Sequence, residues 1–288
     1  MKDWWDDRPV FSTADTGSRI TGLAPGESPG HVTTRLAVLG ALCFVAWSAA
    51  SLLGTSWLCN ASSAPAGTCA VGFPSGVRLL WRILATVVVA YVLLHFSLSF
   101  GENARQRLGQ SRAAGLLVGS ALLAGIAVGA GFSVAAGFST DPSETLRRTL
   151  DFRIGTEAYA ISAALALVAV LWWIFVLGRL PAALVTARER QATIERLRRD
   201  GHRYAGTVKL GRIVFWLGQS PELEVTIAYD SPAGAHEIKA RMRTSPDRVP
   251  ADGSRVVVLD DLRGDLHIEL DRDATPSFEP PERYSASE

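Results

Sequence analysis

The chain is poor in cysteine, methionine and charge. Three Cys and two Met in 288 residues exclude a disulfide scaffold and a cysteine-rich zinc or iron–sulfur protein. Charged residues make up only 20% of the chain, below the roughly 25% that is usual for soluble domains. The 29 basic and 28 acidic residues give a net charge of +1. Proteins that neutralise phosphates carry a clear excess of basic residues, and this chain lacks such an excess. We therefore expect no nucleic acid among its partners.

Long apolar stretches are abundant instead. Four of them reach the roughly 20 residues that a membrane-spanning helix needs: Leu36 to Leu58, Leu79 to Phe100, Ala113 to Phe138 and Ala158 to Leu180. The first begins only after some thirty mostly polar residues, unlike a cleavable signal peptide. Nearly all positive charge is arginine, as in proteins from GC-rich bacteria. The sequence predicts a four-helix transmembrane domain over residues 32–180, embedded in the lipid bilayer of a bacterial inner membrane.

The arginines predict the orientation of the spans. If the N-terminus is cytoplasmic, eleven arginines flank the spans on the inner side and five on the outer side. Positive residues concentrate on the cytoplasmic side, so both termini are predicted to be cytoplasmic. Cys59 and Cys69 then share the first outer loop, on the oxidising side of the membrane. We predict a disulfide between them, with two unrelated free thiols as the alternative.

Residues 181–201 follow the last span and are rich in helix formers. They predict a basic stalk helix that ends near Gly201. Its arginines are expected to lie near lipid headgroups. The alternative, which fits the sequence equally well, is a solvent-exposed helix face on which Glu189 and Glu195 pair with these arginines. These arginines are Arg188, Arg190, Arg196, Arg198 and Arg199.

Beyond the stalk, apolar residues alternate with polar ones, as in half-buried strands. Six short runs between Tyr204 and Leu270 predict a small all-β barrel over residues 202–272, of the SH3-like or OB-like type. The segments at the two ends, residues 1–31 and 273–288, are rich in Pro, Gly, Ser and acidic residues. Both are predicted to be disordered tails.

This β-rich segment resembles a widespread bacterial family of unknown function. The resemblance rests on Gly206-x-Val208, on Val225-x-Ile227-x-Tyr229 and on the spaced residues Pro250, Gly253, Val256 and Val258. Where that pattern commonly closes with Tyr-Asp-Pro, this chain has Leu259-Asp260-Asp261. The resemblance implies an architecture typical of actinobacterial membrane proteins, with a cytosolic β-module attached to a few membrane helices, and no catalytic residues.

Motifs for catalysis are missing. The chain has no phosphate-binding loop, no zinc-helix signature, no nucleophile turn and no C-x-x-C pair, and these motifs carry most recognisable enzyme chemistry. His202, His236 and His267 lack ligand-like spacing, so we predict ordinary histidines, no metal and no cofactor. The sequence indicates a non-catalytic membrane protein that serves as a scaffold, sensor or regulatory subunit of a membrane or envelope complex.

Two features of the spans leave other roles open. His95 and Glu102 lie seven residues apart and can share one helix face, so a transporter or channel component with a polar path is the alternative function. The third span carries two small-residue pairs that allow close helix packing. Either the four helices pack around it, or it contacts a membrane protein partner or a second copy. These glycines are Gly115, Gly119, Gly125 and Gly129.

Overall fold

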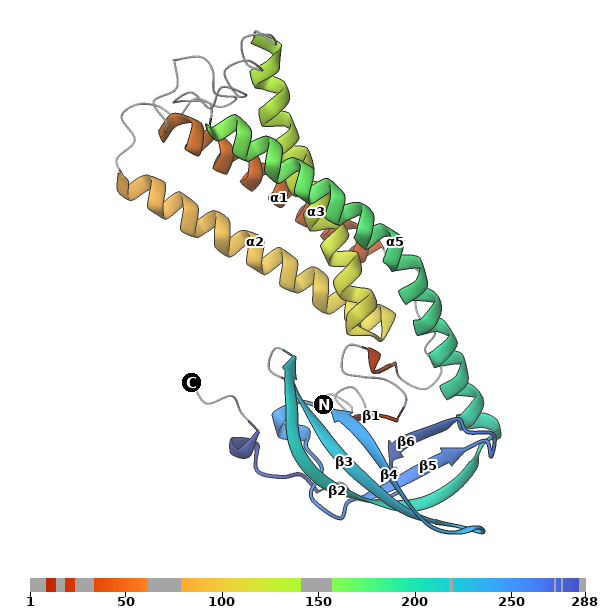
Figure 1. Ribbon diagram of the computed structural model, residues 1–288. Coiled ribbons are helices and arrows are strands. Elements are labelled where there is room, and N and C mark those ends of the chain that lie inside the picture. The colour runs from red at the N-terminus through yellow and green to blue at the C-terminus, as the bar shows by residue number, and fades with distance from the viewer. Residues whose placement is uncertain are drawn as a thin grey trace. The chain divides into compact units, whose positions relative to one another are not determined.

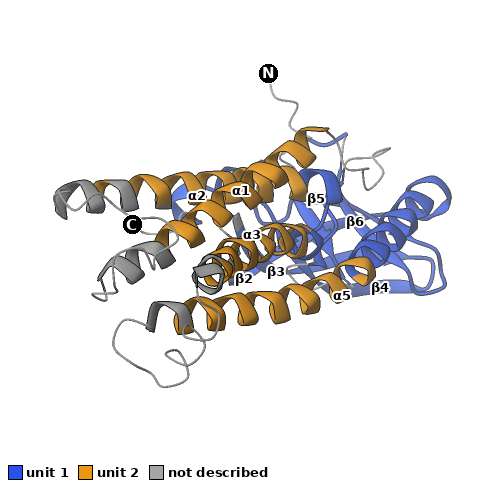
Figure 2. Ribbon diagram, turned by 90° about the horizontal axis from the view of Figure 1, so that it is seen from above, with its two compact units in different colours: residues 1–30, 106–113, 183–288 blue, residues 31–105, 114–182 orange. Residues whose placement is uncertain are grey.

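The computed structural model describes residues 9–13, 19–23, 34–61, 79–140, 157–217, 220–271, 273–275 and 277–284 (Figure 1). The chain divides into two compact units, which are coloured separately in Figure 2. Unit 1 joins residues 1–30, 106–113 and 183–288, and unit 2 joins residues 31–105 and 114–182. Unit 1 is therefore built from three segments that are far apart in the sequence.

The four predicted spans are helices. They are α1 (Thr34–Ala61), α2 (Leu79–Leu108), α3 (Ser111–Thr140) and α5 (Glu157–Asp200). Each contains an apolar stretch long enough to cross a membrane. Helix α5 continues through Pro181 to Asp200, so the predicted stalk and the fourth span form one helix with residues in both units. It ends where Gly201 donates to the carbonyl of Leu197.

Unit 2 is held by contacts from α1 to both α2 and α3. The ring of Phe100 lies against Gly40, and Trp47 Nε1 donates a 3.0 Å hydrogen bond to Ser97 Oγ. From the same helix, Ser51 Oγ donates to the carbonyl of Ile126 on α3 at 3.2 Å. Hydroxyl and indole donors thus add polar contacts to the small apolar cluster of unit 2.

Unit 1 contains a six-stranded antiparallel sheet in the order β1-β4-β3-β2-β5-β6. The strands are β1 (Val10–Ser12), β2 (His202–Leu217), β3 (Ser220–Ser231), β4 (Gly234–Arg243), β5 (Arg255–Asp260) and β6 (Leu266–Leu270). The edge strands β1 and β6 contact each other, so the sheet is nearly closed into a barrel. Alternate residues such as Val225, Ile227 and Met242 are buried in its interior, as the period of two predicts. The sequence predicts separate strands over Tyr204 to Leu210 and Arg212 to Leu217, but β2 joins these two runs, with register shifts between Leu210 and Phe215.

The two tails are not wholly disordered, and that prediction is wrong for several segments. Val10, Phe11 and Ser12 pair with β4, and Phe11 is only 1% exposed. Arg19 to Leu23 includes the buried residues Ile20 and Leu23. Near the C-terminus, Phe278 pairs with Pro250 and Tyr284 is buried in the barrel core. Phe11 and Tyr284 belong to the barrel core, so one buried aromatic ring anchors each of these two tail segments.

Candidate functional site

The end of α5 packs against the outer face of β5 and β6. Ile194 and Leu197 of this helix are buried. On the strands, Leu259 and His267 face each other across the β5–β6 pair and are also buried, at 3% and 5% exposure. Neighbouring residues of these strands, such as Val258 and Ile268, fill the barrel core. Strands β5 and β6 are thus covered on both faces, on the outside by α5.

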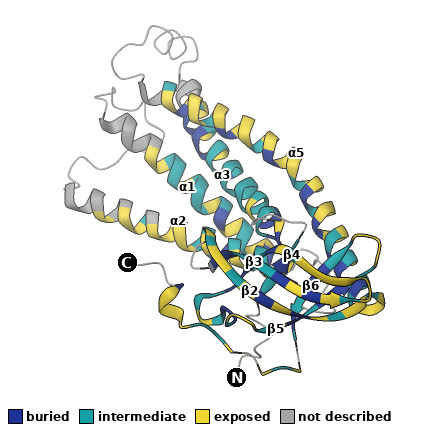
Figure 3. Cartoon of the chain, turned by 60° about the horizontal axis from the view of Figure 1, so that its bottom comes forward, coloured by how far each residue is buried: buried dark blue, intermediate teal, exposed yellow. Residues whose placement is uncertain are grey.

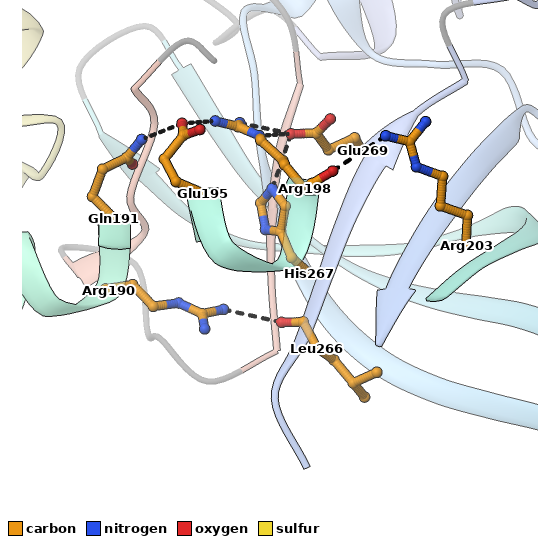
Figure 4. Close-up of polar contacts among 8 residues, drawn as sticks. All are labelled: Arg190, Gln191, Glu195, Arg198, Arg203, Leu266, His267 and Glu269. Atoms are coloured by element: carbon orange, nitrogen blue, oxygen red, sulfur yellow. Dashed lines mark hydrogen bonds and ion pairs between the residues drawn. The ribbon is translucent and has the colours of Figure 1, made fainter. Parts of the chain in front are cut away.

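A network of ion pairs joins this end of α5 to β6, which we call the α5–β6 clamp (Figure 4). Arg198 Nη2 lies 2.6 Å from Glu269 Oε1, and the two side chains are only 11% and 13% exposed. Arg198 also pairs with Glu195, one turn earlier on the helix. Gln191 extends the network by donating to Glu195. Because these charges neutralise one another within a largely buried site, the clamp fixes the helix against the strand.

Two further arginines of α5 bind the same hairpin. Arg190 donates to the backbone carbonyl of Leu266 at 3.2 Å. Arg196 lies 2.6 Å from Asp265 and 3.2 Å from Asp261, in the turn between β5 and β6. Hydrogen bonds from the backbone N–H of Arg263 and of Asp265, with Arg196 nearby, lower the pKa of Asp261. The turn therefore keeps its negative charge toward the helix.

His267 lies inside the clamp with one ring nitrogen unused. Its Nε2 is 3.1 Å from Glu269 Oε1, and since a carboxylate only accepts, Nε2 carries the proton. Nδ1 is buried and has no hydrogen-bond partner among the described residues. Burial lowers the pKa of His267, and the nearby Arg198 and Arg190 lower it further against the opposing effect of Glu269. The ring is accordingly neutral at pH 7.

Glu269 is the charged centre of the clamp. Burial alone would raise its pKa, but the hydrogen bond from His267 and the charge of Arg198 outweigh burial and hold the pKa at about 2. A cavity of about 490 Å³ opens beside it, lined by charges of both signs that include Arg199, Arg203, Asp271 and Asp273. This mixture gives the cavity no preference for an anion or a cation.

The turn between α2 and α3 forms a second connection within unit 1. Gly109 ends α2 with a φ of 70°, a conformation that glycine adopts readily at helix ends. Its carbonyl accepts a 2.9 Å hydrogen bond from the N–H of Gly22. Next to it, the buried Gln110 donates to Thr21 Oγ1 at 2.7 Å. Arg243 of β4 completes this connection by donating to Ser111 Oγ at 2.9 Å.

The five arginines predicted at lipid headgroups have different surroundings. Arg190, Arg196 and Arg198 bind the β5–β6 hairpin or its carboxylates, partners that the sequence analysis did not predict. Arg199 is exposed and pairs with the adjacent Asp200. Arg188 is also exposed, and for these two the contact with headgroups stays a prediction. The helical period of α5 decides which arginines face the strands.

The structure does not bring His95 and Glu102 together into one site. Glu102 pairs with Arg105 at 2.9 Å. His95 is exposed on α2, and its ring stacks on Tyr91 with centroids 6.2 Å apart. Each of these contacts lies within α2 itself. The polar path for transport stays a prediction that no described contact favours.

The two glycine pairs of α3 differ. A side chain at Gly125 would approach the carbonyl oxygen of Phe44 on α1 to 2.6 Å, and one at Gly129 would overlap the carbonyl oxygen of Ser48. Gly115 and Gly119 have open space. Close packing within the four helices therefore accounts for the second pair and leaves the first unexplained.

The predicted disulfide lies outside what the structure can test. Cys69 is not among the described residues, and Cys59 belongs to the last turns of α1, where side chains are not described. Cys43, the cysteine within the first span, is buried as a free thiol between α1 and α2, 3.8 Å from Ser97 Oγ. The pairing of Cys59 with Cys69 stays a prediction.

Sequence reasoning missed His267 and Glu269 as members of a site. They alternate with Leu266, Ile268 and Leu270, which predicts a polar, solvated face of β6 rather than a buried one. The available signal was the series of arginines in the helix before the barrel, whose charges need partners. Comparison with protein-family models, curated proteins and solved structures finds no match for this chain.

Proposed function

We propose that this chain is a multi-pass bacterial inner-membrane protein with both termini in the cytoplasm. It acts without catalysis, as a sensor or regulatory subunit in which a membrane helix controls a β-module of SH3-like or OB-like type. The observation that carries this proposal is the composition of unit 1. Unit 1 consists of the N-terminal segment, the α2–α3 turn and residues 183–288.

This composition supports the orientation by a parity argument. If four helices each cross the bilayer once, the segment before α1, the turn after α2 and the segment after α5 all emerge on one side. These are the three segments that form unit 1, connected by the bonds from Gly22 to Gly109 and from Arg243 to Ser111. The excess of arginine near the same segments favours the cytoplasm as that side.

The α5–β6 clamp supports the regulatory role. Helix α5 contains an apolar stretch able to cross a membrane and, without interruption, the arginines that bind the β5–β6 hairpin. A shift or rotation of this helix would therefore act directly on β6. The charged groups of the α5–β6 clamp form ion pairs with one another. This arrangement fits the transmission of force better than the turnover of a substrate.

Thiol labelling of intact cells tests the orientation. In a variant without native cysteines, a cysteine at Ala233, in the exposed β3–β4 turn, should react with a membrane-impermeant reagent only after the cells are permeabilised. A cysteine at Ser143, in the segment between α3 and α5, should react in intact cells. Labelling of Ala233→Cys in intact cells would place the β-module outside and contradict the proposal.

Crosslinking in native membranes tests the regulatory role. The wild-type chain should recover a protein partner after capture in mild detergent. Arg198→Ala, which opens the clamp, should reduce that recovery, whereas Arg199→Ala on the same helix turn should not. Recovery of the wild-type chain alone, or equal recovery by the two variants, would argue against control through α5.

A further inference from the structure

Among the described residues, only β1 covers the outer edge of β4, and it covers only part of that edge. Strand β1 pairs with β4 at three residues, from Arg241 to Arg243. The rest of β4, from Gly234 to Ala240, has β3 on one side and no neighbouring strand on the other in the portion of the chain described. A row of backbone donors and acceptors along such an edge can pair with another strand. We call Gly234 to Ala240 the open β4 edge.

Two opposite charges lie two residues apart on this edge. Much of the open β4 edge is exposed (Figure 3). Glu237 and Lys239 are both exposed and project to the same face, because side chains of a strand alternate. Across β3 they face the uncharged residues Ala228 and Thr226. Within the described ranges, neither Glu237 nor Lys239 has an ion-pair partner. Both charges are therefore available to a partner that pairs with the edge.

The order of these charges makes the edge complementary to itself. In an antiparallel pair of two β4 strands centred on Ile238, Glu237 of each copy lies directly opposite Lys239 of the other. Opposite charges in such cross-strand positions stabilise a sheet. We propose that the open β4 edge binds the same edge of a second copy of this chain, with Ile238 on the two-fold axis. The inference goes beyond the proposed function and does not depend on it.

Charge also selects this register over its neighbours. Shifting the centre to Glu237 places the two Glu237 carboxylates opposite each other, and shifting it to Lys239 opposes the two ammonium groups. Like charges in these positions are destabilising. The centred register instead brings the half-buried Ile238 against its counterpart on the opposite face. An interface of this kind is isologous and closes as a dimer.

Charge reversal in the full-length chain tests this interface. Two differently tagged copies are expressed together, extracted in mild detergent at low salt, and captured through one tag. The measured quantity is the fraction of the second tag recovered. Glu237→Lys or Lys239→Glu, present in both copies, should lower this fraction roughly tenfold, because two attractive pairs become two repulsive ones. Lys209→Glu, an exposed reversal on β2 away from the edge, should leave the fraction unchanged.

Two restoring combinations make the test specific. The double variant E237K/K239E exchanges the charges and should recover the wild-type fraction. One copy with Glu237→Lys and one with Lys239→Glu should also associate, since all four edge charges are then complementary between copies. If the wild-type copies do not associate, if the single reversals leave recovery unchanged, or if neither combination restores it, the open β4 edge is not the interface.

Discussion

Arg198 of α5 and Glu269 of β6 form an ion pair of 2.6 Å that is almost completely shielded from solvent. The pair joins residues that are 71 positions apart, and it lies on the outer face of the barrel rather than in its core. Glu269 also binds His267, so one carboxylate holds two side chains in place. The stability of the α5–β6 clamp is expected to depend on this carboxylate.

Arg198→Ala should destabilise unit 1 by about 3 kcal/mol, because removing one partner leaves the other charge buried without compensation. Glu269→Ala should cost a similar amount. The double variant should lose much less than the sum of the two, which a thermal unfolding series in detergent can measure as a double-mutant cycle. Additive losses would show that the two side chains act independently.

The clamp should weaken in mild acid. The pKa of His267 lies below its ordinary value of 6.5 in the folded chain, so the unfolded chain binds the proton first. The contribution of this residue is therefore complete above pH 6.5 and is lost as the pH falls below it. Protonation would also put a donor on Nδ1, which has no described acceptor. The unfolding midpoint should drop between pH 7 and 5.5.

His267→Gln should remove this pH dependence, and His202→Gln, at an exposed position, should retain it. A second loss should appear at lower pH, since Glu269 stays charged in the folded chain down to about 2 and titrates near 4.5 when unfolded. Its stabilising effect is present above pH 4.5 and disappears toward pH 2. An unchanged profile in His267→Gln would assign the first transition to another group.

Gly129→Ala should destabilise unit 2 by about 1–3 kcal/mol, because the new methyl group overlaps the carbonyl oxygen of Ser48 on α1 and overpacking forces the backbones apart. Gly119→Ala is the matched control. Its site is open, and alanine favours a helix, so stability should stay equal or rise. Thermal unfolding of both variants in the same detergent compares them, and equal losses would contradict close packing of α1 and α3.

Phe11→Ala should destabilise unit 1 by about 3–4 kcal/mol, the usual cost of emptying a buried phenylalanine site. Phe11 is 1% exposed and belongs to the barrel core. The loss should appear as faster hydrogen exchange at the β4 residues that pair with β1. A variant as stable as the wild type would mean that β1 is dispensable for the barrel.

The sequence predicts the long elements well and their terminal additions poorly. Each span has an apolar run of the length that a helix needs, and β3 and β6 show a period of two over at least five residues. Strand β1 is three residues long, too short to show any period, and its partner Met242 lies far along the chain. Only the composition of the tail is therefore available for prediction, and composition describes the average of a segment rather than one buried aromatic ring.

The clamp escaped prediction for a different physical reason. The alternation in β6 is real, and Ile268 does face the core while His267 faces outward. Periodicity along a strand cannot reveal that α5 covers the outward face. Burial of His267 and Glu269 is a property of two elements together, and the sequence of either element alone does not contain it.

The pairing of β1 with β4 has a consequence for biosynthesis. Val10 leaves the ribosome about 230 residues before its partner Arg243, which at ordinary translation speeds is a wait on the order of tens of seconds. During that time Phe11 lacks the strands that bury it in the folded chain. The barrel can therefore close only after β4 has been translated. In a nascent chain that stalls earlier, β1 stays exposed to chaperones and proteases.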